Sequence, residues 1–378
     1  MSKEIIYYGK QTITEDDIDA MSQVLNSDLI TTGPVTKEFE KEIANFSGAR
    51  YCVAVSNGTV ALHLVSLALL KEGSKVLTTP NSFLATSNSI LYIGAKPIFV
   101  DIAEDGNIDL DLCEEMLQKD SSIEALYGVS FSGNMLNQKK LKHLKDKYNI
   151  IILEDNAHAI GAVYDGIQAG SCVNSDASIF SFHPVKHMTT GEGGAITTNS
   201  KKLYEKLLIL RNHGMVKTDK LKPWEYNMVT LGFNGRITDF QCALGLSQLK
   251  KLPDFIEKRV SIAKRYDASF KNTVVKPLYF YNGKSSYHIY VVKVDFSKLK
   301  ISKLDLYNSL RDKYSIALQI HYMPINKQPY YKELGYGNES TPNMDRYYEE
   351  CFSLPMYPLL SDEEQEYVIK SLLEVLNG

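Results

Sequence analysis

The sequence predicts an α/β protein, with a large domain on a mostly parallel sheet and a smaller α+β domain at its C-terminal end. Three observations lead to this fold class. Short apolar runs alternate with segments of helical length from Tyr51 to Thr198, which is typical of a parallel sheet covered by helices on both faces. A length of 378 residues allows one large core and a second, smaller one. The alternation changes near Lys250, so we expect the domains to span 1–250 and 251–378.

Two helices are expected before the alternation begins. Thr14 and Asp17 have the spacing of a capping box, with Asp in place of the usual Glu, and predict a helix that continues to Leu25. The Gly-Pro loop at 30–34 ends this segment. Apolar residues then recur at helical spacing, so we expect a second helix at 36–47.

The remaining elements follow from apolar runs and their breaks. Strands are expected at 51–55, 75–79, 97–101, 125–129 and 150–154, with helices at 60–70 and 85–92 between them. Two further strands, at 177–181 and 195–198, flank a turn and a glycine-rich segment. In the C-terminal part we expect a long helix at 254–272, a strand at 287–294, and helices at 304–314 and 362–376.

Composition and charge exclude several classes of protein. The net charge of −3, without a dense run of Lys and Arg, argues against a nucleic-acid partner. The apolar helix at 60–70 is far shorter than the ~20 residues that cross a bilayer, so we expect no membrane span. The five cysteines are scattered without metal-ligand spacing, and the N-terminus lacks the pattern of a signal peptide. We therefore expect a cytoplasmic protein.

Lys186 lies on a turn between the strands at 177–181 and 195–198, just after His183 and Pro184. A lysine on a rigid turn can lose its proton at modest cost where burial or neighbouring cations favour the neutral amine. It can then condense with an aldehyde as a Schiff base. Taken alone, however, a lysine is far more often a solvated surface residue.

Other polar residues follow predicted strands, where ligands of such sheets bind. Gly58 and Thr59 open a helix directly after a strand, which suits a phosphate group, although a plain helix cap explains them equally well. Asp155 and His158 follow the strand at 150–154, as a turn aspartate or a core histidine would. Ser181 ends another strand, and its hydroxyl either caps that strand or binds the same phosphate.

These segments, taken together, resemble the DegT/DnrJ/EryC1/StrS family of sugar aminotransferases that use pyridoxal phosphate. The resemblance lies in SNGTVAL at 56–62, EDNAH at 154–158, SFHPVKHMTTGEGGA at 181–195 and GFNGRITD at 232–239, and it covers nearly the whole chain. It implies the aspartate-aminotransferase-like fold, fold type I of pyridoxal-phosphate enzymes, and it implies that Lys186 holds the cofactor and moves the substrate proton. No metal is expected, because the cofactor ring supplies the electron sink.

The resemblance also implies roles for the other candidates. Gly58, Thr59 and Ser181 would bind the cofactor phosphate, and Asp155 would keep the ring nitrogen protonated. His158 would flank the ring near its phenolic oxygen, whereas Phe83, in a segment PNSFLAT that matches the family's aromatic position, would stack on the ring face. Without the resemblance, Phe83 reads as a core residue.

Asn234 matches the asparagine of the family pattern GxNxRxxD, which reaches the phosphate of the neighbouring subunit's cofactor. A homodimer with shared active sites is therefore expected. Two positions depart from the family: Gly235 stands where relatives carry a larger residue, and His187 stands where Pro or Asn is commoner. A dehydratase branch of the family has histidine in place of the lysine, and Lys186 argues against that branch.

The segments FSGNMLN, CALGLSQLKKL and IHYMPI followed by QPYY look most like one branch of the family. That branch transfers an amino group from L-glutamate to C4 of a UDP-linked 4-keto-6-deoxy-N-acetylhexosamine, on the way to pseudaminic acid. Candidates for sugar binding are Thr31, Gly33, Arg236, His321 and Tyr322.

Other interpretations stay open. The D-xylo keto sugar of the bacillosamine and legionaminic routes, or a GDP- or dTDP-linked sugar, would suit a similar site. A regulator that only binds pyridoxal phosphate is a non-enzymatic alternative, which the set of Lys186, Asp155 and Ser181 argues against. A dinucleotide-dependent oxidoreductase would need a GxGxxG turn after the first strand, and the residues at 56–59 do not supply one.

Overall fold

The protein is described here by a computed structural model covering residues 4–218, 220, 222–278 and 283–377. Its centre is a seven-stranded sheet in the order β1-β9-β8-β5-β4-β2-β3. The strands are β1 (Tyr51–Val55), β2 (Lys75–Thr78), β3 (Lys96–Phe99), β4 (Ile123–Val129), β5 (Ile151–Asp155), β8 (Ala177–Ser181) and β9 (Gly194–Thr198). Only β9 runs against its neighbours, β1 and β8, so the prediction of a mostly parallel sheet is confirmed.

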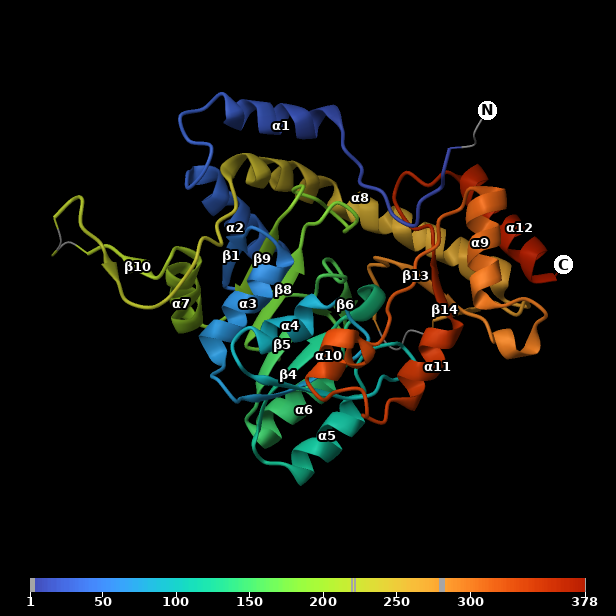
Figure 1. Ribbon diagram of the computed structural model, residues 1–378. Helices are drawn as coiled ribbons and strands as arrows, with labels where there is room; N and C mark the ends of the chain where they lie inside the picture. The colour runs from blue at the N-terminus through green and yellow to red at the C-terminus, as the bar shows by residue number, and fades with distance from the viewer. Residues whose placement is uncertain (1–3, 219, 221, 279–282, 378) are drawn as a thin grey trace.

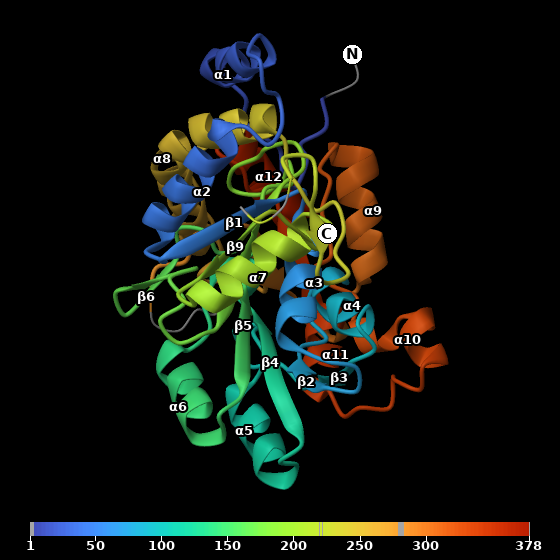
Figure 2. The ribbon, with the colours of Figure 1, turned by 90° about the vertical axis from the view of Figure 1, so that its left-hand side faces the viewer.

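Helices cover both faces of this sheet. Successive residues of a strand point to opposite sides, and here the side chains on both sides are apolar and buried. Val53 and Val55 of β1 pack in a core with α3 (Gly58–Leu69) and α7 (Lys201–Arg211), and α4 (Ala85–Leu91) adds Ile90 to that core. Cys52 and Ala54 face the other way, into a core with α2 (Pro34–Ser47) and α8 (Asp239–Phe270). Figure 2 shows β1 and β9 between these two groups of helices.

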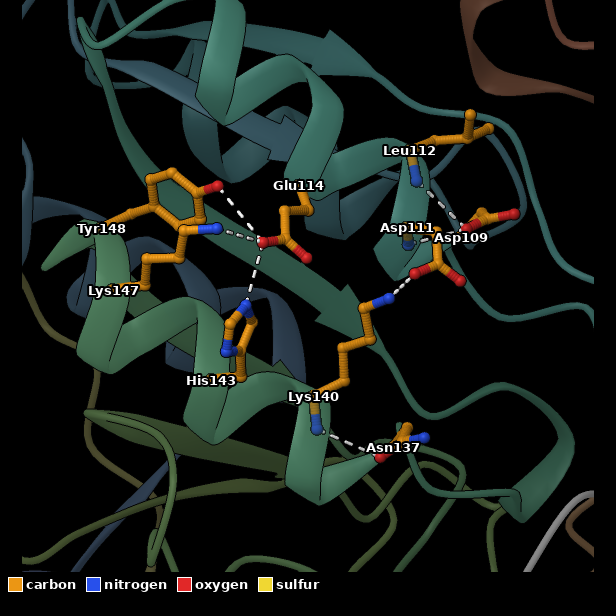
Figure 3. A network of polar contacts seen from close by, with 9 residues as sticks. All are labelled: Asp109, Asp111, Leu112, Glu114, Asn137, Lys140, His143, Lys147 and Tyr148. Carbon is orange, nitrogen blue, oxygen red and sulfur yellow. Dashed lines mark hydrogen bonds and ion pairs between the residues drawn. The ribbon is translucent and has the colours of Figure 1, made fainter.

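The far end of the second face is covered by α5 (Leu110–Lys119) and α6 (Gln138–Tyr148). Their outer surface carries a network of charged side chains, shown in Figure 3. Glu114 accepts hydrogen bonds from His143 at 2.9 Å and from Lys147 at 2.8 Å, and Lys140 pairs with Asp111. This network lies at the surface of the protein.

Helix α1 (Glu15–Leu25) begins with the predicted capping box, in which the side chains of Thr14 and Asp17 bond to each other's backbone. Asp17 is fully buried against α8, where Ser247, Gln248 and Lys251 all donate hydrogen bonds to its carboxylate. Figure 1 shows α1 lying along the first part of α8.

The prediction that a long helix starts at Asp254 is wrong. Helix α8 starts at Asp239 and passes through Pro253 without ending. A proline inside a helix costs about 3 kcal/mol, but here both halves of the helix are held by packing. Leu249 and Leu252 belong to the sheet core, whereas Tyr266 and Phe270 belong to a second core. The domain division near residue 250 falls within this helix and stays a prediction.

The second core is the α+β part of the chain. Its sheet has three antiparallel strands, β12 (Lys276–Pro277), β13 (Tyr290–Lys293) and β14 (Cys351–Leu354). It is covered by α9 (Lys303–Tyr314) and α12 (Asp362–Asn377), and Ile6 near the N-terminus also packs into it. Two further helices are short, α10 (Pro329–Glu333) and α11 (Pro342–Glu350). Two pairs of short strands lie outside the sheets described above. In the first pair β6 (Val163–Tyr164) bonds to β7 (Ile167–Gln168), and in the second β10 (Met215–Val216) bonds to β11 (Asn227–Met228). Among the residues covered by the structure, no helix combines the length and the apolar character needed to cross a membrane.

Candidate active site

A cavity of about 630 Å³ opens beyond the carboxyl ends of β5 and β8, where parallel sheets bind ligands. It brings together most of the residues predicted from the sequence: Gly58, Thr59, Phe83, Asp155, His158, Ser181, Lys186, His321 and Tyr322. These residues come from five separate segments of the chain, and His321 and Tyr322 belong to its C-terminal part. The cavity therefore lies between the seven-stranded sheet and the C-terminal part of the chain.

Lys186 reaches this cavity from the turn between β8 and β9. Its backbone amide donates to the His183 carbonyl at 2.9 Å, which closes the turn. Burial lowers the pKa of the Lys186 amine to about 8, and the carboxylate of Asp155 opposes that shift. Nζ lies 3.4 Å from Nε2 of His288. Near neutral pH the amine is therefore much closer to losing its proton than a surface lysine is.

Asp155 ends β5 and is buried with its carboxylate fully hydrogen-bonded. Thr86 donates to one oxygen at 2.7 Å, and the Ala157 amide donates to the other at 3.1 Å. Burial raises the pKa of Asp155, while these two hydrogen bonds and the charge of Lys186 lower it. Both direct donors are neutral, so the carboxylate has no hydrogen-bonded cation among the described residues. A cationic group of a ligand would suit this end of the cavity.

His158 is buried beside Asp155, and its hydrogen bonds fix the position of its proton. The Ser132 amide donates to Nδ1 at 3.4 Å, so in the neutral ring Nε2 carries the hydrogen and donates to the Tyr322 hydroxyl at 3.2 Å. Burial and the charge of Lys186 hold the pKa of His158 well below its ordinary value. The Tyr322 hydroxyl then keeps its own hydrogen free to donate into the cavity.

The start of α3 forms another wall. Asn57 caps the helix, accepting from the Val60 amide at 2.8 Å, and the amides of Gly58 and Thr59 belong to the turn that has no intrahelical acceptors. Gly58 lies against Ser181, because a Cβ at Gly58 would come within 3.0 Å of the Ser181 Cβ. The amides, the helix dipole and the Ser181 hydroxyl together make a suitable site for an anion.

Phe83 lies at the mouth of the cavity with 60% of its surface exposed. Its ring centroid is 6.5 Å from that of Tyr322, with the two planes tilted by 57°. Such exposure for a large aromatic side chain is consistent with a ligand or another chain covering it. The interpretation of Phe83 as a core residue is therefore wrong.

Four predicted residues lie outside this cavity. Gly33 and Arg236 line a second cavity of about 610 Å³, and Thr31 pairs with Thr238 next to it. Arg236 donates to Asn212 at 2.6 Å, and the amide of Gly33 donates to Asp239 at 2.9 Å. Asn234 is exposed, and its side chain accepts from the amide of Arg236 at 3.3 Å. Within one chain, these residues are not brought to Lys186.

The two departures from the family pattern have structural reasons. The Gly235 carbonyl accepts from the Ser56 amide at 3.0 Å, and a Cβ at this position would come within 3.0 Å of Val60, so a larger residue is disfavoured. His187 is buried and directs Nε2 at the Ser286 carbonyl, 3.0 Å away. It thereby joins the lysine turn to the segment before β13.

Several residues of the cavity were missed by sequence reasoning. Thr86 lies four residues after Ser82, and their hydroxyls are 2.8 Å apart; both belong to the segment PNSFLAT, whose hydroxyl residues could have been recognised as candidates. Tyr8 and His288 also line the cavity, but they come from segments far from Lys186 in the sequence and carried no local signal. No group of three or more His, Cys, Asp or Glu side chains that could hold a metal ion is found in the described part of the chain.

Comparison with known proteins agrees with this geometry. A model of the DegT/DnrJ/EryC1/StrS aminotransferase family matches residues 11–373. The chain is 38% identical to the UDP-4-amino-4,6-dideoxy-N-acetyl-beta-L-altrosamine transaminase of Campylobacter jejuni, covering 98% of each chain. It is also similar to the solved structure of Helicobacter pylori PseC, an aminotransferase involved in the biosynthesis of pseudoaminic acid, with a TM-score of 0.92, 32% identity and coverage of 99% and 100%. A putative sugar aminotransferase from Streptococcus pneumoniae, solved in its PLP-form, gives a TM-score of 0.90 at 30% identity, covering 99% of each chain.

These solved aminotransferases cover the sheet and the C-terminal part of the chain alike. They confirm the predicted aspartate-aminotransferase-like fold. They do not assign roles to individual residues of the cavity, so these roles are inferred from its geometry.

Proposed function

The chain belongs to the DegT/DnrJ/EryC1/StrS aminotransferase family, and from this premise we propose that it moves an amino group from L-glutamate to C4 of a UDP-linked 4-keto-6-deoxy-N-acetylhexosamine. It is a sugar aminotransferase, and its cofactor is pyridoxal phosphate. One observation carries the assignment of the site: the cavity joins a lysine amine, a buried carboxylate without a hydrogen-bonded cation and an anion-binding helix start.

The residues of the cavity fit this cofactor. The helix start at Gly58 and Thr59, with Ser181, would hold the phosphate. Asp155 would face the ring nitrogen and keep it protonated, and the exposed ring of Phe83 would cover one face. When bound, pyridoxal phosphate supplies an electron sink for the carbon that loses its proton.

Lys186 carries the proton transfer in this proposal. Because burial brings the pKa of its amine to about 8, the amine can take a proton from the substrate carbon and return it near neutral pH. Thr86 and the Ala157 amide keep the Asp155 carboxylate in one orientation, and His158 does the same for the Tyr322 hydroxyl. The hydroxyl of Tyr322 and the ring of His321, which both line the cavity, would contact the sugar.

The names of the relatives support the proposed identity of the substrate. Relatives from Campylobacter jejuni and Helicobacter pylori, at 38% and 34% identity, are named as the altrosamine transaminase. Another, at 29% identity, is named for a UDP-4-amino sugar and for oxoglutarate, the keto acid that L-glutamate becomes on losing its amino group. We expect the L-arabino ketone to be preferred and the product to enter pseudaminic acid synthesis.

The test offers the L-arabino and D-xylo keto sugars separately with L-glutamate, and identifies the 4-amino products by mass and NMR. A site that hydrogen-bonds one epimer can reject the other by several orders of magnitude, so a clear preference is expected. Preference for the D-xylo ketone, or for a GDP- or dTDP-linked sugar, would move the chain to another branch. If no keto sugar is aminated although the cofactor is bound, a regulatory role would replace the enzymatic one.

A homodimer with shared sites is the second part of the proposal. Asn234, Arg236, Gly33 and Thr31 lie away from Lys186 in one chain, which suits residues that serve a partner's cavity. The segment around β10 and β11 projects from the body (Figure 1) and exposes large apolar side chains: Trp224, Tyr226, Met228, Val229 and Leu231. A second copy of the chain would cover them.

Complementation tests the shared site. Lys186→Ala and Asn234→Asp variants should each be inactive, because the second variant places a negative charge beside a phosphate. In a mixed dimer, one site receives both intact residues, so mixing and reassembly should restore part of the activity. A mixture as inactive as its components would remove the support for a role of Asn234 in the partner's site.

The five cysteines are all buried and free, which suits the cytoplasm as the location.

A further inference from the structure

We propose that His288 is a positioning residue for Lys186: its neutral ring accepts a hydrogen bond from the lysine amine and holds that amine in place when it is free. This inference rests on the proposed function, because it concerns the same lysine. Nε2 of His288 lies 3.4 Å from Nζ of Lys186. Within the described ranges of the chain, this is the one side-chain hydrogen bond that the amine makes.

The direction of this hydrogen bond follows from chemistry. A lysine ammonium only donates, so Nε2 accepts and the ring hydrogen lies on Nδ1. That Nδ1 is buried and has no hydrogen-bond partner among the described residues. Burial and the charge of Lys186 hold the pKa of His288 well below its ordinary value, which keeps the ring neutral and able to accept.

The backbone of His288 is held by hydrogen bonds at both its amide and its carbonyl. Its amide donates to the Ser132 carbonyl at 3.1 Å. Its carbonyl accepts from Nη1 of Arg259 at 3.0 Å, and the same guanidinium group binds the Met356 carbonyl at 2.9 Å. Arg259 is itself fully buried in α8 and forms no ion pair with a carboxylate in the described ranges. The fold thus fixes the backbone that carries the ring, and the ring in turn holds the amine.

Neighbouring rings complete the packing. The centroid of His288 is 4.3 Å from that of His158 and 5.5 Å from that of His187. Both neighbours are also buried with lowered pKa values. The titratable groups whose charges couple to Lys186 are Asp155, His158, His183, His187, His288 and His321. Of these, only His288 bonds to the amine.

The test measures the titration of Lys186 in the full chain freed of cofactor. Carbamoylation by cyanate is followed against pH by mass spectrometry of the Lys186 peptide, with the Lys147 peptide as reference in each digest. In the wild type the midpoint is expected near pH 8. His288→Phe keeps a ring but removes the acceptor, so the ammonium loses a partner and the midpoint should fall by about one pH unit.

Two further variants separate positioning from packing. His288→Gln retains an acceptor oxygen at similar reach and should keep the midpoint close to wild type. His143→Gln, on the surface of α6 (Figure 3), should leave it unchanged. If the Phe variant melts early, His288→Leu repeats the removal with a smaller side chain.

A midpoint that stays or rises in both the Phe and the Leu variant would overturn the proposal, as would a Gln variant shifted as far as they are. Failure of the proposed function would appear differently, as a wild-type chain that aminates no sugar while Lys186 still titrates as expected.

Discussion

The cavity and the surface network on α5 and α6 use the same chemical groups in opposite states. At the surface, hydrogen bonds from Lys147 and His143 lower the pKa of Glu114 to about 2, and Glu114 in turn raises the pKa of Lys147. In the cavity, burial raises the pKa of Asp155 and lowers that of Lys186 to about 8. Burial and the charge of the hydrogen-bond partners, not residue type, decide which form of each group is favoured.

This difference separates a structural ion-pair network from a reactive site. The surface pairs keep their charges and are screened by water and salt, so they contribute little to stability. The cavity holds a lysine close to neutrality beside a carboxylate bonded only to neutral donors. Such a pair is suited to proton transfer and to binding a charged ring.

Removal of the amine should produce the largest contrast between the two regions. We expect Lys186→Ala to lower turnover by more than about 10³-fold, because tethering of the cofactor and proton transfer are lost together. Lys147→Ala should remain close to wild type. Steady-state kinetics of both variants measure the contrast, and a Lys186→Ala enzyme with near wild-type turnover would refute the assignment of this lysine.

The next largest difference is expected between substitutions of the two carboxylates, Asp155 in the cavity and Glu114 at the surface. Asp155→Asn preserves shape but removes the charge that would keep the ring nitrogen protonated, so kcat/KM should fall by on the order of 10²- to 10³-fold. Glu114→Gln should leave kcat/KM unchanged. It should shift the urea midpoint only slightly, and that shift should disappear in high salt. Equal effects of the two substitutions on kcat/KM would contradict a special role for Asp155.

A smaller effect is expected at Thr86, which donates to Asp155. Thr86→Val removes the donor at almost constant shape, and loss of one hydrogen bond to a charged group should lower kcat/KM about tenfold. Thr86→Ser retains the hydroxyl and should recover most of the activity. If the Ser variant is as slow as the Val variant, packing of the methyl group, not the hydrogen bond, is what matters at this position.

A further effect concerns the stability of the fold and its dependence on pH. The pKa of Lys186 falls from its ordinary value of 10.5 to about 8 in the fold. Between these pH values the unfolded chain binds the extra proton, so the cofactor-free protein should gain stability as pH rises through this window. Lys186→Met removes the penalty of burying the charge. It should therefore be more stable than wild type at pH 7, with the gap closing towards pH 10.

Urea denaturation of the wild type and Lys186→Met at pH 7, 8.5 and 10 measures this gap. Buried tyrosines titrate in both proteins, so their contributions cancel in the difference. A gap that does not change with pH would show that Lys186 is not held near neutrality by burial.

The sequence was sufficient to predict the parallel sheet and the residues that follow its strands. Asp155, Ser181 and Gly58 meet because the carboxyl ends of β5 and β8 and the start of α3 share one edge. That is a consequence of the βα alternation, which is visible in the sequence. Tyr322 and His321 were included through the family resemblance alone.

What the sequence could not reveal are contacts between distant segments. His288 precedes β13 by two residues, and its backbone is bound by Ser132 and Arg259, both far away in the sequence, where its ring lies beside Lys186. The change of pattern near Lys250 predicts a helix that starts at Asp254, whereas α8 starts at Asp239 and passes through Pro253, because its two halves pack into two different cores. Tertiary packing, which local pattern does not encode, decided both cases.

We propose that Lys186 and Asp155 form the centre of a glutamate-dependent aminotransferase. The most direct measurement is the absorption spectrum of the purified protein with pyridoxal phosphate, recorded before and after L-glutamate is added, together with the amount of 2-oxoglutarate formed. We predict a visible band that fades on addition of L-glutamate, with about one 2-oxoglutarate released per active site, and no such change in Lys186→Ala. A spectrum that does not respond to L-glutamate, or an equal response in Lys186→Ala, would contradict the account.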